Sequence, residues 1–353
     1  MRCLTLAEEL RRQGHECLFI CRAHEGHLGD LISEKGFELH LLANSEPQEK
    51  SADYGPQLAH AEWLGCTWQK DAEQVRSILN QEQTSWLVVD HYALDANWER
   101  EVANAVGQIM VIDDLADRQH SCLLLLDQTF GRKPSDYFHW TPGACVQLCG
   151  AQYALLRTEF QEWRERSLER REAGKLGHIF VNLGGVDKDN ITSRVLIALK
   201  ACGLPSKTRF TVIMGSTAPW IDHVTALAAE MPWPTEVKVG VSNMAEVMAS
   251  SDLAIGAAGS TIWERSCLGL PSFMVVIADN QTFAAKQLAQ TGALEILTLD
   301  CDFEQSIVEL IRNYQSPVGA LRTMSLAAAS ITKGNGVSMV VKQLRRMGDI
   351  NDN

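Results

Sequence analysis

The sequence lacks an excess of basic residues. Its 353 residues carry 32 Lys and Arg against 44 Asp and Glu, a formal net charge of -12 at pH 7. A protein that binds nucleic acid without sequence preference needs a basic surface to displace counterions from the phosphates. The composition therefore argues against a nucleic-acid partner. Any anionic ligand must be bound locally, for example by the N–H groups at the start of a helix.

Sequence signals for a zinc site, a membrane span or secretion are also lacking. No pair among the ten cysteines has C-x-x-C spacing. No apolar run approaches the roughly 20 residues of a membrane span, and the start of the sequence has no secretory signal. His24 and His27 resemble half of a metal site, but no third ligand is evident, and a polar loop is the favoured interpretation. We predict a cytoplasmic protein with no membrane segment, metal or other cofactor.

Short β-rich segments alternate with amphipathic helical segments, the pattern of parallel sheets covered by helices. The length and the 46% hydrophobic content predict two buried cores. We expect strands in two series, at 16–22, 37–43, 86–91, 108–113, 122–127 and 144–149, and then at 178–183, 209–214, 236–239, 253–256 and 272–277.

The domain boundary is predicted from charge. Alternating Arg and Glu over 158–176 indicate a solvated helix or linker. It would separate an N-terminal Rossmann-like domain, 1–157, from a C-terminal one, 177–353, that ends in a helix over 338–347. The chain opens on a predicted helix that ends near Gly14, whereas a doubly wound domain normally opens on a strand.

Paired glycines mark the first candidate binding segment. Gly184 and Gly185 end a predicted strand before a helix, and could let the backbone approach a diphosphate. An ordinary tight turn is the alternative.

A second candidate segment runs from Ala254 to Arg265, where a strand passes through small residues into a helix. Gly259, Ser260 and Thr261 would present N–H groups and hydroxyls, and the Glu264 carboxylate could accept hydrogen bonds from both hydroxyls of a ribose. The alternative is a capping pair of Ser260 with Glu264.

Two further polar groups follow strands. Asn280 and Gln281, after the strand at 272–277, could contact a sugar or a phosphate, although such residues are often helix N-caps. In the first half, Asp90, His91 and Tyr92 end a strand, where a histidine or tyrosine can position or deprotonate a nucleophile. Asp113 and Asp114 are secondary candidates at a similar position.

These motifs occur together in a recognisable order. The segments 89–92, 112–114, 153–157, 182–185 and 259–264 resemble the bacterial UDP-2,4-diacetamido-2,4,6-trideoxy-β-L-altropyranose hydrolases of pseudaminic acid biosynthesis. The resemblance implies two Rossmann-like domains of the glycosyltransferase B type, with a UDP-sugar bound between them. It implies that water attacks the anomeric carbon and that UDP leaves. It also implies that Gly184, Gly185, Gly259, Ser260, Thr261 and Glu264 hold UDP, with Asn280 and Gln281 near the phosphates or sugar and Tyr92 or His91 at the reacting carbon.

One departure concerns the start of the chain. The family's first strand runs into a Gly-x-Gly-His turn that bears its catalytic histidine, just ahead of a helix similar to the one at Met1–Ala7. This sequence lacks that strand and turn. Two alternatives to the hydrolase therefore stay open, a UDP-sugar glycosyltransferase and a binding protein without catalytic activity.

Overall fold

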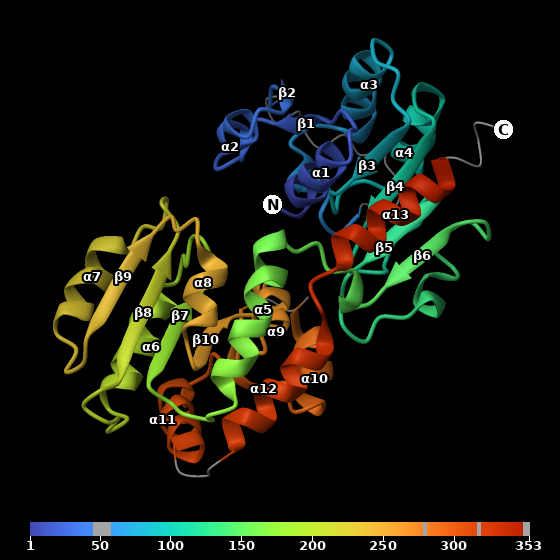
Figure 1. Ribbon diagram of the computed structural model, residues 1–353. Coiled ribbons are helices and arrows are strands. Elements are labelled where there is room, and N and C mark those ends of the chain that lie inside the picture. The colour runs from blue at the N-terminus through green and yellow to red at the C-terminus, as the bar shows by residue number, and fades with distance from the viewer. Residues whose placement is uncertain (45–57, 278–280, 316–318, 349–353) are drawn as a thin grey trace. The chain divides into compact units, whose positions relative to one another are not determined.

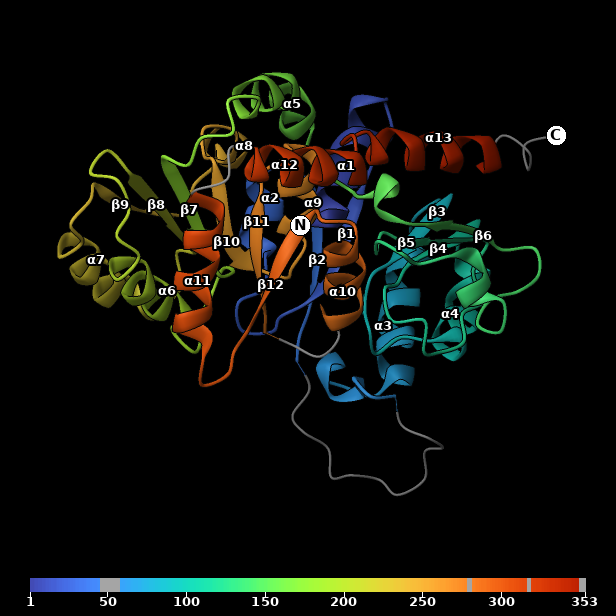
Figure 2. The ribbon, with the colours of Figure 1, turned by 90° about the horizontal axis from the view of Figure 1, so that it is seen from below.

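The computed structural model describes residues 1–44, 58–277, 281–315 and 319–348, and the chain divides into two compact units. Unit 1 comprises residues 1–155 and 337–353, and unit 2 comprises 156–336. Each has a parallel sheet with helices on both faces, so the predicted α/β class is confirmed (Figures 1 and 2).

Unit 2 is built on a six-stranded parallel sheet. Its strands follow the order β12-β11-β10-β7-β8-β9. β7 and β10 occupy the centre, and every residue of both is buried because helices cover each face. The strands are β7 (His178–Asn182), β8 (Arg209–Met214), β9 (Thr235–Val239), β10 (Leu253–Ala257), β11 (Ser272–Val276) and β12 (Leu294–Thr298). The helices are α5 (Thr158–Arg171), α6 (Ile191–Lys200), α7 (Ile221–Ala229), α8 (Met244–Ala249), α9 (Thr261–Cys267), α10 (Thr282–Gln290), α11 (Phe303–Gln315) and α12 (Ala320–Ile331).

Unit 1 contains two separate parallel sheets. One pairs β1 (Leu18–Arg22) with β2 (Glu38–Leu42). The other has β3 (Trp86–Val89), β4 (Gln108–Ile112), β5 (Leu124–Asp127) and β6 (Val146–Cys149) in sequence order. The helices are α1 (Arg2–Arg12), α2 (Gly29–Glu34), α3 (Trp68–Leu79), α4 (Ala96–Val102) and α13 (Gly336–Gly348), with a 3-10 turn at Ala61–Leu64.

The two sheets of unit 1 share the helices that cover them. From α1, Leu4 packs with Phe19 of β1 on one flank, and Leu6 packs with the residues around Val88 of β3 on the other. On the opposite face, residues of α3 pack with Ile20 of β1 and Val89 of β3. β1 and β3 therefore present matching faces to the same helices, yet in the described part of the chain neither bonds to the other. We call this separation the β1–β3 gap.

The predicted domain boundaries differ from the two units. Residues 158–171 form helix α5, so the helix of the two predicted alternatives is confirmed, and α5 packs against α8, α9 and α12 of unit 2, so the segment is not a linker. Although α5 is rich in charged residues, three of its residues are buried, namely Phe160, Ser167 and Arg171. The last helix, α13, was predicted in the C-terminal domain but belongs to unit 1, because Val340 and Leu344 pack with Met110 of β4.

Candidate functional site

Unit 2 brings its predicted binding segments to one edge of its sheet. β10 lies between β7 and β11 and runs parallel to both. The segments that follow the three strands therefore leave the sheet at the same carboxyl edge, where ligands of doubly wound folds bind. These segments contain Gly184 and Gly185, then Gly259, Ser260 and Thr261, and then Gln281.

The turn after β7 has an open side and a packed side. Gly184 has a φ of 100°, a conformation that disfavours any side chain. A Cβ atom added to Gly184 or Gly185 would meet nothing within 4 Å, so their α-carbons face open space. On the packed side, a Cβ on Gly215 after β8 would overlap the carbonyl oxygen of Gly185. This close approach holds the turn in place and leaves its open side for a ligand.

The segment between β10 and α9 is exposed. Gly259 and Ser260 are both exposed, and the Ser260 side chain makes no capping hydrogen bond to α9. The alternative that Ser260 and Glu264 merely cap the helix is therefore not realised. A hydroxyl and the first N–H groups of α9 border the same turn, the donors that an anionic ligand needs.

Glu264 is a largely buried carboxylate beside this turn. Its side chain is 18% exposed, and its Oε1 lies 3.9 Å from Nη2 of Arg157. Burial raises the pKa of Glu264 to about 7, although the charge of Arg157 opposes the shift. Arg157 is closer to Glu159, at 2.9 Å, so it neutralises Glu264 only in part. Glu264 is thus poised to gain or lose a proton near neutral pH.

The segment after β11 is described only in part. Gln281 accepts a hydrogen bond from the N–H of Ile277 at 3.0 Å through Oε1, and so closes the connection from β11 to α10. Asn280 lies outside the described residues. Contact of either residue with a ligand stays a prediction.

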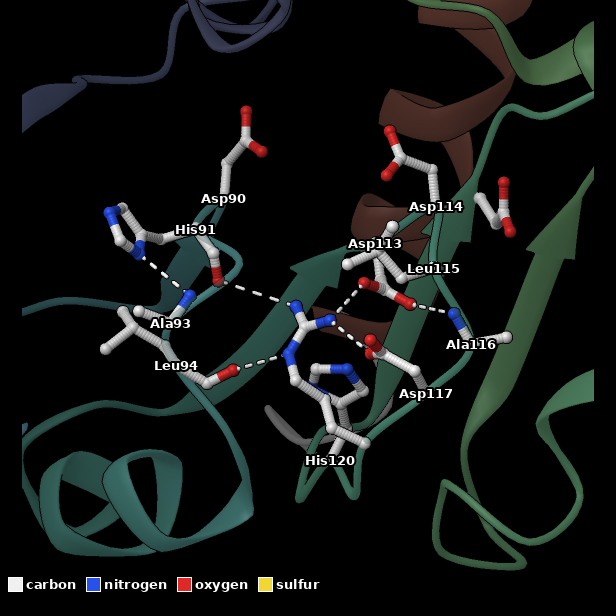
Figure 3. A network of polar contacts seen from close by, with 12 residues as sticks. Asp90, His91, Ala93, Leu94, Asp113, Asp114, Leu115, Ala116, Asp117 and His120 are labelled. Carbon is white, nitrogen blue, oxygen red and sulfur yellow. Dashed lines mark hydrogen bonds and ion pairs between the residues drawn. The ribbon is translucent and has the colours of Figure 1, made fainter. Parts of the chain in front are cut away.

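Unit 1 gathers charged side chains at the carboxyl edge of its larger sheet. Arg2, the first residue of α1, donates to both carboxylate oxygens of Asp90, at 2.6 and 3.0 Å, and to Asp114 at 3.2 Å. Asp90 follows β3 and Asp114 follows β4, and their carboxylates point the same way in Figure 3. Burial disfavours ionised Asp90, but the contacts with Arg2 outweigh it and lower the pKa of Asp90. Arg2 therefore joins two strand ends through ionised carboxylates.

Arg118 is a buried positioning residue that the sequence analysis missed. It donates to the carbonyl of Leu94 at 2.9 Å, to that of His91 at 3.4 Å and to Asp113 at 2.7 Å (Figure 3). It thereby ties the loop that carries His91 and Tyr92 to the end of β4. An arginine five residues after a strand-end aspartate is too common a pattern to reveal this role.

His91 and Tyr92 lie at the predicted strand end, but neither is prepared to be a general base. Nδ1 of His91 accepts from the N–H of Ala93 at 3.0 Å, so in the neutral ring the proton is on Nε2. Burial also lowers the pKa of His91. Burial, the charge of Asp114 and a hydrogen bond to it raise the pKa of Tyr92. His91 can donate a hydrogen bond to a ligand through Nε2, whereas the single hydroxyl proton of Tyr92 is directed at Asp114, so Tyr92 can accept one through its oxygen.

Aromatic rings adjoin Tyr92. The ring centroids of His60 and Trp63 lie 5.5 and 5.9 Å from that of Tyr92, and Trp63 is 55% exposed. His60 and Trp63 could not be singled out from the sequence, because they fall in a segment without strand or helix periodicity.

The described residues contain no group of three His, Cys, Asp or Glu side chains that could hold a metal ion. None of the described helices has the length and apolarity to cross a bilayer.

The sequence of unit 2 and the fold of the chain are similar to those of known proteins. Residues 179–344 match the glycosyltransferase family 28 C-terminal domain. The crystal structure of Acinetobacter baumannii MurG is similar over 98% of this chain and 95% of its own, with a TM-score of 0.68 and 16% identity. The fold is of the glycosyltransferase B type.

Two curated relatives differ in the activity that their names state. The UDP-2,4-diacetamido-2,4,6-trideoxy-β-L-altropyranose hydrolase of Campylobacter jejuni is 24% identical over 216 residues, which cover 61% of this chain and 75% of the hydrolase. The UDP-N-acetylglucosamine–N-acetylmuramyl-(pentapeptide) pyrophosphoryl-undecaprenol N-acetylglucosamine transferase of Acinetobacter baumannii is 26% identical over 189 residues, covering 51% of this chain and 50% of the transferase. The similarity thus extends to enzymes that process UDP-sugars.

Proposed function

We propose that this protein hydrolyses UDP-2,4-diacetamido-2,4,6-trideoxy-β-L-altropyranose to UDP and the free sugar. The observation that carries the proposal is the carboxyl edge of unit 2, where a glycine turn, exposed helix-start donors and the Glu264 carboxylate follow neighbouring strands. This set matches a nucleoside diphosphate, with the N–H groups for phosphate and the carboxylate for ribose hydroxyls. The similarity to the Campylobacter jejuni hydrolase supports the sugar and the reaction.

In this reaction the bond between the anomeric carbon and the diphosphate oxygen breaks, and UDP takes the bonding electrons. Water forms the new bond to that carbon and gives up a proton to a base. His91 and Tyr92 are better suited to position the sugar or the water, since one has its proton on Nε2 and the other has a raised pKa. The base must therefore come from another group.

We propose that the base is a histidine like the one that the resemblance implies on a Gly-x-Gly-His turn, and that a parallel strand carrying such a turn would fit the β1–β3 gap and lead into α1. The gap supports this proposal, because β1 and β3 have matching faces and shared covering helices but no bonds to each other in the described residues. A strand there followed by α1 and β1 would form a right-handed crossover unit. Its carboxyl end would lie beside Arg2, Asp90 and Asp114.

The test compares UDP release by the 353-residue chain with release by the chain extended upstream through a strand and a Gly-x-Gly-His turn. We expect turnover by the extended form alone, and loss of that turnover when the added histidine is replaced by Ala. Equal activity of both forms would refute the assigned base. Absence of UDP release from both would refute the hydrolase.

The transferase is the second candidate, because the Acinetobacter baumannii transferase matches half of this chain. It predicts UDP release that requires a saccharide acceptor. A hydrolase releases UDP at the same rate without any acceptor.

A further inference from the structure

Unit 2 contains a buried arginine whose charge no carboxylate contacts directly. Arg265 of α9 is 1% exposed. Its Nη2 donates to the carbonyl of Ala257 at 2.7 Å, whereas Nε and Nη1 have no hydrogen-bond partner in the part of the chain that the structure describes. Removing a guanidinium from water is unfavourable unless it is paired and its donors are satisfied. Arg265 meets neither condition within the described residues.

The position of Arg265 relates it to the candidate ligand site. Ala257 is the last residue of β10, directly before the turn at 258–260, in which Gly259 and Ser260 are exposed. A Cβ on Gly256 would overlap Nη1 of Arg265, so the guanidinium lies against the end of β10 where only a glycine leaves room. The guanidinium of Arg265 therefore lies beneath the turn at 258–260, which borders the proposed diphosphate site.

A second buried arginine of unit 2 shows what a purely structural role looks like. Arg171 is 5% exposed and likewise lacks a carboxylate hydrogen-bond partner. Its two terminal nitrogens donate to three carbonyls, those of Ser167, Met248 and Ala249, and so bind the end of α8. Arg171 is occupied on both terminal nitrogens, whereas Arg265 uses only one.

We infer that Arg265 is a positioning residue that holds the turn between β10 and α9 and supplies from below the positive charge for a nucleoside diphosphate bound there. The inference rests on the proposed nucleotide site of unit 2. It accounts for a buried cation that the neighbouring Glu264 compensates through its charge alone and without a hydrogen bond, since the bound diphosphate would supply further counter-charge. The ligand class follows from that charge, because a neutral nucleoside would not compensate it.

The experiment measures the affinities for UDP and for uridine by ligand-detected NMR, and compares their ratio among variants. Arg265→Met should lower the UDP-to-uridine ratio about tenfold to a hundredfold, the range expected for loss of one charge at partly screened distance. Arg265→Lys keeps the charge and should retain most of the ratio. Arg171→Met, the matched control, should lower thermal stability while leaving the ratio unchanged.

Gly256→Ala provides a second route if Arg265→Met does not fold. The added methyl group keeps the guanidinium of Arg265 but displaces it, so the ratio of the UDP to the uridine affinity should also fall. An unchanged ratio in Arg265→Met or in Gly256→Ala, or an equal fall in Arg171→Met, would overturn the inference. Failure of the wild-type protein to bind either ligand would instead refute the nucleotide site itself.

Discussion

Binding of a UDP-sugar should depend on pH through Glu264. Only the ionised carboxylate offers an unprotonated oxygen to each of the two ribose hydroxyls, and the pKa of Glu264 in the ligand-free protein is raised to about 7 by burial. At about pH 8 most molecules hold the carboxylate, whereas at about pH 6 roughly one in eleven does. The apparent affinity should therefore fall about tenfold between these two pH values.

The same residue should destabilise the ligand-free protein. Its pKa lies near 4.5 in the unfolded chain and near 7 in the folded one, so the folded state binds more protons between these values. The free energy of unfolding therefore falls as pH rises through this window, and above about pH 7 the ionised carboxylate costs about 3 kcal/mol. Glu264→Gln should recover most of that stability at about pH 8 and little of it at about pH 4.

The assay is calorimetric titration with UDP-N-acetylglucosamine, whose phosphate diester does not titrate in this range, together with urea unfolding. Glu264→Gln should bind weakly at every pH and unfold at higher urea near pH 8. The control, Glu159→Gln, should keep binding and shift its midpoint to lower pH, since the charge of Glu159 raises the pKa of Glu264. A pH-independent affinity in the wild type, or a less stable Glu264→Gln, would refute the reasoning.

Three other substitutions test the supports of the site. Tyr92→Phe in the upstream-extended chain should reduce kcat less than about tenfold and leave the pH profile of kcat unchanged, because Tyr92 is not the base. Complete loss of turnover would contradict a role for Tyr92 in positioning the sugar or the water. Arg118→Met should cost about 3–5 kcal/mol in urea unfolding and raise KM, since it leaves the buried Asp113 carboxylate without its arginine ion-pair partner; unchanged stability would show that the contacts of Arg118 in Figure 3 are weak. Gly215→Ala should cost about 1–3 kcal/mol and weaken UDP binding, because its Cβ overlaps the Gly185 carbonyl; unaltered affinity would mean that the turn moves without consequence.

The strands of both units could be predicted from the sequence because most are buried apolar runs of distinct length. Each predicted strand is present, whereas β12 was missed. β12 lies at one edge of the sheet and is only partly buried, but β9 at the other edge is no better buried and was predicted, so burial alone does not explain why β12 was missed. The assignment of α13 to unit 1 could not be predicted, because an apolar helical face does not specify which sheet it covers.

The placement of Gly184 and Glu264 at the carboxyl edge of the sheet was predictable, because they follow buried strands and small-residue turns, whereas their contact with a ligand stays a prediction. The arginines that hold the strand ends in place could not be predicted. Arg2, Arg118 and Arg265 act through partners at strand ends that only the fold brings close. Surface and buried arginines look alike in a sequence, since the pattern of neighbours reveals neither burial nor a missing partner.

The most direct test of the proposed hydrolysis is turnover of the UDP-diacetamido-trideoxy-altrose by the extended chain in water enriched in ¹⁸O, without any saccharide acceptor, followed by mass spectrometry of both products. Attack of water on the anomeric carbon predicts one ¹⁸O in the free sugar, analysed before exchange, and none in UDP. Label in the nucleotide product, or no sugar release until an acceptor is added, would contradict it.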